Sequence, residues 1–120
     1  GKKLSANFTV KEFACKDGSD AVLTAPRLVM VLQSIRSHFA APVVIHSAYR
    51  TPQYNAEVGG AAHSQHCYGT AADISVRGQT PAAVAAYARE LMPDWGGVGV
   101  YAGQGFTHID VRETRSDWTG

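Results

Sequence analysis

Cysteine is scarce in this sequence: Cys15 and Cys67 are the two among 120 residues. Two thiols permit one disulfide, but they exclude a scaffold held together by several bridges. A chain of this length buries roughly 65% of the surface that its unfolded form exposes, which is enough for one hydrophobic core without bridges. We therefore expect two independent thiols that pack as small apolar groups.

Clusters of positive charge and long apolar runs are also missing. The formal net charge is +1 and the basic residues are scattered, so no nucleic-acid partner is indicated. No apolar stretch approaches the roughly 18 residues of a membrane span. We expect one monomeric domain over residues 1–120, in which residues 1–24 form an N-terminal arm that packs on the core through Phe8, Val10 and Phe13. The sequence indicates no cellular compartment.

Hydrophobic spacing predicts two helices. The first begins near Pro26 and keeps a helical period for about 14 residues. Its apolar positions are Leu28, Val31, Leu32, Ile35 and Phe39. The second has Thr80 as its N-cap, proline at the first helical position, and an alanine-rich run through Leu91.

Short segments rich in β-branched residues predict four strands. They are residues 43–46, 71–76, 97–101 and 106–111, and the last two have the glycine-rich connection of a hairpin. The sequence therefore predicts an α+β fold, with two main helices on one side of a small, mainly antiparallel sheet.

Metal-ligating side chains gather in the second half of the chain. A catalytic zinc site commonly has three protein ligands, among them imidazole nitrogens and carboxylate oxygens, and one open position. His66, Asp73 and His108 can supply that set. The step from His66 to Asp73 suits a loop residue and a strand residue that converge across a turn at Gly69. On spacing alone the signal is weak, because single histidines are more often core or surface residues.

Five stretches of the chain carry a more specific pattern. They are Ser47-Ala-Tyr-Arg50-Thr-Pro, Val58-Gly-Gly-Ala, Ser64-Gln-His66-Cys-Tyr-Gly69-Thr-Ala-Ala-Asp73, Gly96-Gly-Val-Gly-Val-Tyr101 and Phe106-Thr-His108-Ile-Asp110-Val-Arg112. Together they resemble the M15 family of zinc peptidases, which includes D-Ala-D-Ala carboxypeptidases and related cell-wall endopeptidases. The resemblance runs from about Phe8 to Arg112.

The resemblance implies one Zn²⁺ ion held by His66, Asp73 and His108, in the small α+β fold that the family shares with hedgehog-type domains. It implies hydrolysis of a peptide bond in the peptidoglycan stem or cross-link, as a DD-carboxypeptidase or endopeptidase. Zinc suits this task because it yields a nucleophile from water near neutral pH. Peptidoglycan stem peptides are then the expected partners. The place of action is the bacterial cell wall, reached from the periplasm, from outside the cell or during phage lysis.

The sequence does not identify the general base. Related branches of the family place an acid three residues before the last histidine or a histidine two residues before it, and here Gly105 and Phe106 stand there. Asp110 is the first candidate, because residues two apart on a strand share a face. An equally good alternative is that Asp110 orients His108. His63 is the second candidate, against a plain role in a surface loop.

Three residues are candidates for substrate contacts. By the resemblance, Arg50 corresponds to a family arginine whose donors suit a substrate carboxylate or a developing oxyanion, which makes it a catalytic as well as a binding candidate. Its alternative is a structural ion pair. Ser64 is expected at the edge of the site or as a loop cap, and Tyr101 in the cleft or as a half-buried strand residue. We expect the two tryptophans, Trp95 and Trp118, to pack over the core rather than against a sugar.

Two other functions remain. The glycine and phenylalanine at positions 105 and 106 allow a non-catalytic module that keeps the zinc and binds the cell wall. A third possibility is a structural zinc site with Cys67 as a fourth ligand, because a site closed by four protein ligands leaves no position for water. The adjacency of Cys67 to His66 makes joint chelation geometrically awkward.

Overall fold

The structure is a computed structural model that describes residues 5–8, 10–13, 25–50, 55–56, 58 and 65–120. The two main helices are α1 (Pro26–Phe39) and α3 (Pro81–Leu91), and two short 3-10 helices are η1 (Val10–Phe13) and η2 (Gln65–Tyr68). The strands are β1 (Val43–Ser47), β2 (Ala71–Val76), β3 (Gly97–Tyr101), β4 (Phe106–Asp110) and β5 (Ser116–Thr119).

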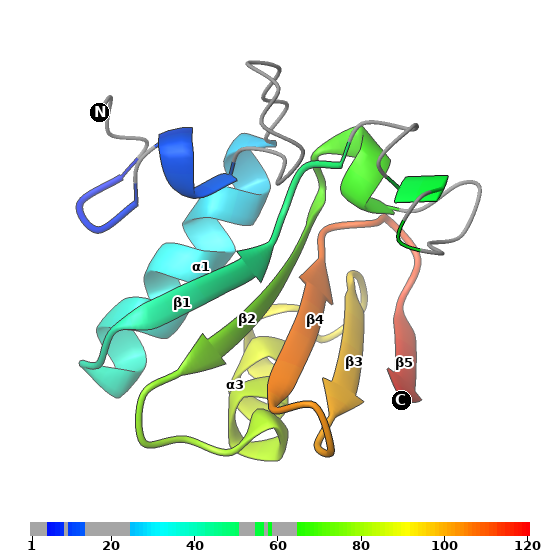
Figure 1. Ribbon diagram of the computed structural model, residues 1–120. Coiled ribbons are helices and arrows are strands. Elements are labelled where there is room, and N and C mark those ends of the chain that lie inside the picture. The colour runs from blue at the N-terminus through cyan, green and yellow to red at the C-terminus, as the bar shows by residue number, and fades with distance from the viewer. Residues whose placement is uncertain (1–4, 9, 14–24, 51–54, 57, 59–64) are drawn as a thin grey trace.

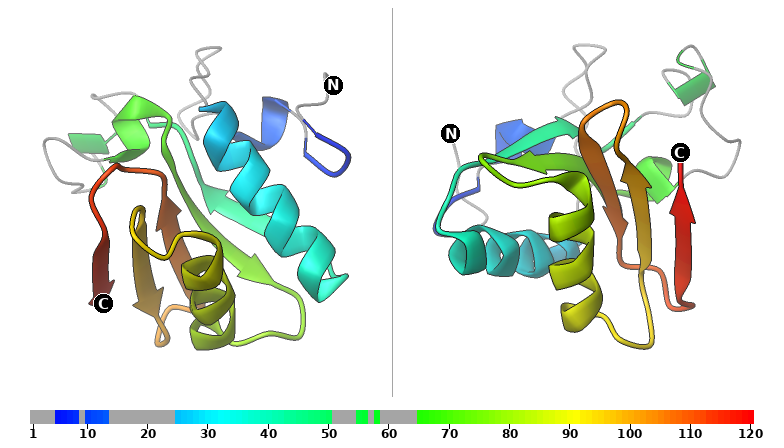
Figure 2. Two further views of the ribbon diagram at one scale, coloured as in Figure 1. Left: turned by 180° about the vertical axis from the view of Figure 1, so that it is seen from behind. Right: turned by 90° about the horizontal axis from the view of Figure 1, so that it is seen from below.

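The five strands form one sheet in the order β1-β2-β4-β3-β5. All neighbouring pairs are antiparallel except β3 and β5, which are parallel. Both main helices lie on the same side of this sheet (Figures 1 and 2). The predicted α+β fold with a mainly antiparallel sheet is therefore confirmed. None of the described helices is long and apolar enough to cross a membrane.

The predicted helices have the predicted bounds. α1 turns one apolar side toward the sheet, and its buried residues are Leu28, Val29, Val31, Leu32 and Ile35. Its N-cap, Ala25, provides no side-chain cap, and the Ala25 backbone N–H instead donates to the Gly69 carbonyl at 2.8 Å. At the start of α3, the predicted cap is confirmed, because the Thr80 hydroxyl accepts from the Ala83 N–H at 3.1 Å.

The hydrophobic core lies between the helices and one face of the sheet. Side chains alternate between the two faces of a strand, so Ile74 of β2 and Ile109 of β4 point into the core and are fully buried. Their neighbours Asp73 and His108 therefore point to the other face. We call this other face, which α1 and α3 leave uncovered, the open face; η2 lies at one end of it (Figure 1).

The N-terminal arm packs as expected where it is described. Phe8 and Phe13 are buried, with ring centroids 6.0 Å apart in an edge-on arrangement. The Phe13 carbonyl accepts from the Tyr49 N–H at 3.2 Å, which ties η1 to the segment after β1. The side chain of Val10 lies outside the described part.

A fifth strand was not predicted. β5 is a four-residue edge strand of mixed polarity, and it pairs with β3 rather than with a neighbour in sequence. Arg89 of α3 holds it in place, since its guanidinium donates to the Ser116 carbonyl at 3.2 Å and to Asp117 Oδ1 at 3.0 Å. A strand held by such distant contacts carries little signal in its own residues.

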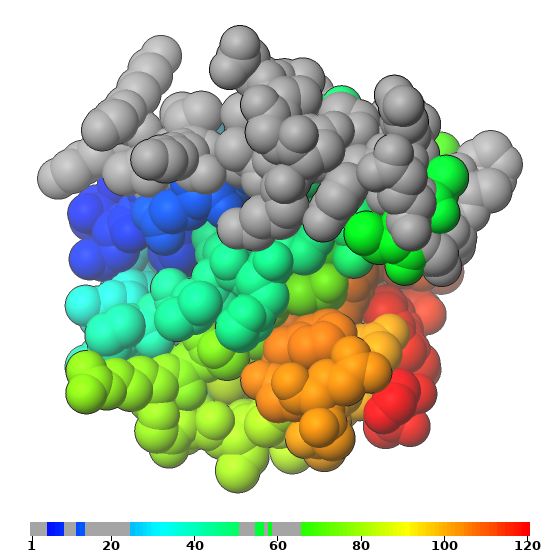
Figure 3. Space-filling model, viewed as in Figure 1, coloured from blue at the N-terminus to red at the C-terminus, as the bar shows by residue number. Residues whose placement is uncertain are grey.

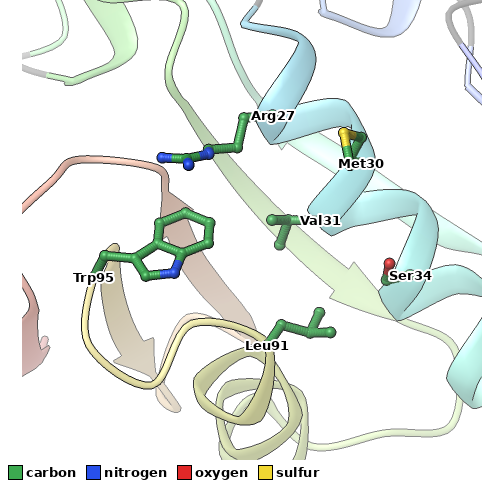
Figure 4. A pocket seen from close by; sticks show the side chains of 6 residues that line it. All are labelled: Arg27, Met30, Val31, Ser34, Leu91 and Trp95. Carbon is green, nitrogen blue, oxygen red and sulfur yellow. The ribbon is translucent and has the colours of Figure 1, made fainter.

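An apolar pocket of about 200 Å³ opens between α1 and α3 (Figure 4). The residues around it are Arg27, Met30, Val31, Ser34, Leu91 and Trp95. The Arg27 guanidinium carbon lies 4.4 Å from the centroid of the Trp95 ring. This pocket is on the helical side of the molecule and none of the candidate site residues lines it.

Candidate metal centre

Strand register places the central site residues in one row across the open face. Ser47 of β1 pairs with Asp73 of β2, Asp73 pairs with His108 of β4, and His108 pairs with Gly99 of β3. Gly99 in turn pairs with Trp118 of β5. Residues paired across neighbouring strands have their side chains on the same face. The sheet therefore brings the carboxylate of Asp73 and the imidazole of His108 together.

His66 reaches this row from η2. Gly69, with a φ of 70°, provides the turn between η2 and β2 that the sequence predicted. His66 Nδ1 lies 2.6 Å from the Ala48 carbonyl oxygen. Because a carbonyl can only accept, Nδ1 carries the proton and donates. The other nitrogen, Nε2, is left as the ligand atom and lies 3.3 Å from Asp73 Oδ2.

The three predicted ligands form a compact, buried group. His66, Asp73 and His108 offer ligand atoms that all lie within 4.8 Å of one another, and the three residues are 3%, 6% and 8% exposed. Ligands about 2.1 Å from a tetrahedral zinc ion are about 3.4 Å apart. The 3.3 Å between His66 and Asp73 and the 2.9 Å between His108 Nδ1 and Asp73 Oδ1 are close to that spacing. The donor set therefore fits a metal ion with small movements.

His108 lies between two carboxylates. Its Nδ1 faces Asp73 Oδ1 at 2.9 Å, and its Nε2 faces Asp110 Oδ2 at 2.8 Å. Asp110 is fully buried and also accepts from the Gly97 N–H at 2.9 Å. The Arg112 guanidinium donates to both of its oxygens, at 2.8 and 2.6 Å. Asp110 therefore contacts the side of the imidazole that faces away from the other ligands.

The pKa values of the site reflect these contacts. Burial lowers the pKa of His108, but the hydrogen bonds to Asp110 and Asp73 outweigh this and raise it above 6.5. Burial raises the pKa of Asp73, but the hydrogen bonds from His108 and His66 outweigh it and hold the pKa well below the usual range. The pKa of Asp110 is low for the same reason, through His108 and Arg112. Without a metal, the site therefore favours a protonated His108 between two ionised carboxylates.

Arg50 lies beside the ligand group. Its Nε donates to Ser47 Oγ at 3.3 Å and its Nη1 donates to Asn55 Oδ1 at 3.2 Å. Its Nη2 lies 3.6 Å from Asp73 Oδ2, and the side chain is 18% exposed. Two neighbours thus hold the guanidinium in position beside Asp73.

The remaining candidates are placed less directly. Tyr101 is two residues from Gly99 on β3, so it shares the open face, and its hydroxyl accepts from Trp118 Nε1 at 2.8 Å. Ser64 and His63 lie outside the described residues. Cys67 is described as a free, half-buried thiol and does not belong to the ligand group, so the fourth-ligand alternative gains no support.

Trp118 is a site neighbour that the sequence did not reveal. Its indole lies 5.0 Å from the His108 ring, between ring centroids, on the open face. The expectation that both tryptophans pack over the core is confirmed for Trp95 and wrong for Trp118. The error follows from the missed strand, because the side on which Trp118 points is set by the pairing of β5 with β3.

A family model described as Peptidase M15 matches residues 4–110, a span that includes Arg50 and all three ligand candidates. Arg112 and Trp118 follow after the matched span. No curated protein matches the chain.

Proposed function

The chain belongs to the peptidase M15 family, and on that premise we propose that it hydrolyses a peptide bond in the peptidoglycan stem or cross-link with the help of one zinc ion. The reaction is that of a DD-carboxypeptidase or an endopeptidase. M15 peptidases are metallopeptidases, and the group of His66, Asp73 and His108 on the open face can hold a metal. This ligand group, buried yet on the face of the sheet that α1 and α3 leave uncovered, is the observation that carries the proposal.

Zinc is the ion that this donor set favours. Two imidazoles and one carboxylate are a common ligand set of catalytic zinc and leave one coordination position open. When bound, the ion polarises a carbonyl group and makes water a nucleophile near neutral pH. The half-buried thiol of Cys67 stands outside the ligand group, which supports an open rather than a closed site.

Asp110 acts on the ligand rather than on the substrate in this proposal. It is fully buried, and its two oxygens accept from Arg112, from the Gly97 N–H and from His108 Nε2. A general base has to reach the attacking water, whereas Asp110 sits behind the imidazole. We therefore assign Asp110 as the residue that fixes the tautomer of His108, so that Nδ1 ligates. The second candidate base, His63, stays a prediction.

Arg50 is proposed to bind the substrate. The 3.6 Å between its Nη2 and Asp73 Oδ2 is longer than a hydrogen bond, so Nη2 keeps donor capacity on the side of the ligand group. Ser47 and Asn55 hold the guanidinium in position before substrate arrives. A preorganised cation beside the metal suits a substrate carboxylate or the oxyanion that develops at the scissile carbonyl. Tyr101 and Ser64 remain candidates for contacts at the edge of the site.

The test is the release of peptides from purified peptidoglycan, with the products identified by mass spectrometry. We expect zinc-dependent release by the native chain, loss of release in His66→Ala, and unchanged release in the control His46→Ala. His46 is an exposed histidine on β1 whose Nε2 faces Ser75 Oγ at 2.8 Å, and it is not part of the ligand group. Binding of peptidoglycan without release would contradict the proposal and favour the non-catalytic wall-binding module. The mass of the released fragments distinguishes a carboxypeptidase from an endopeptidase.

A further inference from the structure

Strand β5 brings an aromatic side chain against a metal ligand. The ring centroids of Trp118 and His108 are 5.0 Å apart, with an angle of 49° between the planes. Trp118 lies after the end of the span that the family model matches. Figure 3 shows the segment of β5 (red) at the molecular surface, and in the sheet order β5 is the edge strand next to β3.

Gly99 makes room for the indole. A Cβ atom built on Gly99 would lie 2.5 Å from Trp118 Cε2 and 2.5 Å from Nε1, far inside van der Waals contact. The indole therefore rests directly on the backbone of β3, at the position paired with both His108 and Trp118. A side chain at position 99 would have to displace the ring.

Two further contacts fix the indole in this position. Its Nε1–H donates to the Tyr101 hydroxyl at 2.8 Å, and the Tyr101 ring is stacked on Phe106 with 4.6 Å between centroids. The guanidinium carbon of Arg112 lies 5.3 Å from the centroid of the Trp118 ring, which favours a cation–π interaction. Because Arg112 also binds Asp110, the residues that hold His108 form one connected set.

We propose that Trp118 is a positioning residue of the metal centre, which keeps the His108 ring at the tilt that metal ligation requires. Asp73 and Asp110 contact the imidazole at its two nitrogens, in the plane of the ring, and small turns about the Cα–Cβ and Cβ–Cγ bonds of His108 would still change the tilt of the ring. A bulky side chain packed against the ring limits that rotation. The inference rests on the proposed metal binding and adds the segment after the matched span to the site.

The test uses Co²⁺ alone as a probe and needs no substrate. Affinity is measured by competition with a chelator, and the ligand geometry by the visible absorption of the bound ion. Residues that hold a metal ligand typically change affinity 10- to 100-fold when they are replaced. We expect Trp118→Ala to weaken cobalt binding about 10-fold or more and to alter the visible spectrum, and Trp118→Phe to restore part of the affinity.

Fluorescence supplies an independent readout, since the chain has two tryptophans. Bound Co²⁺ quenches a nearby indole. In Trp95→Phe, where Trp118 is the one emitter, quenching should be strong and affinity native. In Trp118→Phe, where Trp95 is the emitter, quenching should be weak, because Trp95 packs on the core at the helical side.

A second variant reaches the same ring without removing it. Gly99→Ala should push the indole away from His108 and weaken cobalt binding in the same direction as Trp118→Ala. If Trp118→Ala does not fold, the cobalt affinity of Gly99→Ala tests the positioning role instead. Native affinity and a native spectrum in Gly99→Ala and Trp118→Phe, or equal quenching of the two tryptophans, would overturn the positioning role. A native chain that binds no cobalt would overturn the metal centre itself.

Discussion

The position of His108 between two carboxylates decides which of its nitrogens can bind a metal. Asp110 accepts from Nε2 at 2.8 Å, so Nδ1 points toward Asp73 and the His66 side chain. His66 is fixed in the opposite sense, because its Nδ1 donates to the Ala48 carbonyl and its Nε2 points inward. One backbone carbonyl and one buried carboxylate thus set the two ligand atoms.

Replacing Asp110 by asparagine separates an orienting role from a base role. The amide keeps an oxygen for His108 but loses the charge that faces Arg112, so we expect zinc affinity to fall about 10- to 100-fold. Peptide release at saturating zinc should remain close to native. Native zinc affinity combined with loss of release would show instead that Asp110 is the base. Zinc affinity and peptide release, measured on the same preparation, decide between the two.

The raised pKa of His108 gives the metal-free chain a pH dependence of known sign. A raised folded-state pKa means that the folded chain holds this proton more tightly than the unfolded chain does. The stabilisation is fully present below the unfolded value near 6.5 and is lost as pH rises through the higher folded pKa. Thermal unfolding of the metal-free chain should therefore show a loss of stability on the alkaline side of pH 6.5 that is absent in His108→Gln. If the stability of His108→Gln depended on pH as that of the native chain does, the raised pKa of His108 would be refuted.

The ligand residues could be predicted from the sequence, and their partners could not. His66, Asp73 and His108 belong to a motif with fixed spacing, and such a motif can be recognised directly in the amino-acid sequence. The tautomer of His66 depends on the Ala48 carbonyl and the tilt of His108 on Trp118, and both contacts arise from register and packing. Asp110 shows the limit most clearly, since the spacing placed it near His108 but left its role undecided.

Sheet register is what assembles the site from separate strands. The row from Ser47 to Trp118 crosses all five strands at one level. A slip of β2 by one residue would turn Asp73 toward the core and Ile74 toward the open face. The buried Ile74 and Ile109 therefore specify the positions of Asp73 and His108.

Arg89 is expected to control β5 from the other side of the sheet. It donates to the carbonyls of Met92, Trp95, Gly96 and Ser116 and contacts Asp117. Arg89→Ala leaves several partly buried acceptors unpaired, so we expect a loss on the order of 1–3 kcal/mol in the free energy of unfolding. Cobalt affinity should also fall, because β5 carries Trp118.

The matched control for Arg89 is Arg77→Ala. Arg77 is exposed in the turn after β2, and a surface substitution of this kind changes stability by roughly 0.5 kcal/mol or less. Chemical denaturation of both variants measures the difference. Equal stabilities would show that the contacts of Arg89 do not hold β5 in place.

Elements with their own hydrophobic period were predicted, with bounds that agree with the structure to within one residue. α1, α3 and four of the strands bury one side against the core, which imposes a period of 3.6 or 2 on the sequence. β5 buries little and owes its place to β3 and Arg89, so its four residues gave no signal. The short η2 helix escaped prediction because it is a single turn that ends at Tyr68, just before Gly69.

In the molecule as a whole, the hydrophobic core and the candidate metal centre lie on opposite faces of the sheet. The apolar core lies between the helices and the sheet, while the ligand group lies on the open face. A fold organised in this way does not depend on the metal for its hydrophobic burial. Removing the ion should therefore weaken the chain without unfolding it.

Chelation tests this division. A ligand that binds only the folded state stabilises it by about 2.7 kcal/mol at a free concentration a hundred times its dissociation constant. We expect a chelator to lower the thermal midpoint while far-ultraviolet circular dichroism at room temperature stays native, and added zinc to restore the midpoint. Unfolding at room temperature on chelation would instead identify a structural zinc.

X-ray absorption at the zinc edge tests the ligand set of the native chain most directly. We predict one zinc per chain with nitrogen and oxygen neighbours at about 2.0–2.2 Å, including two imidazoles, and a weaker imidazole signal in His66→Ala, where one imidazole remains. A sulfur neighbour at about 2.3 Å, or an unchanged spectrum in that variant, would contradict the account.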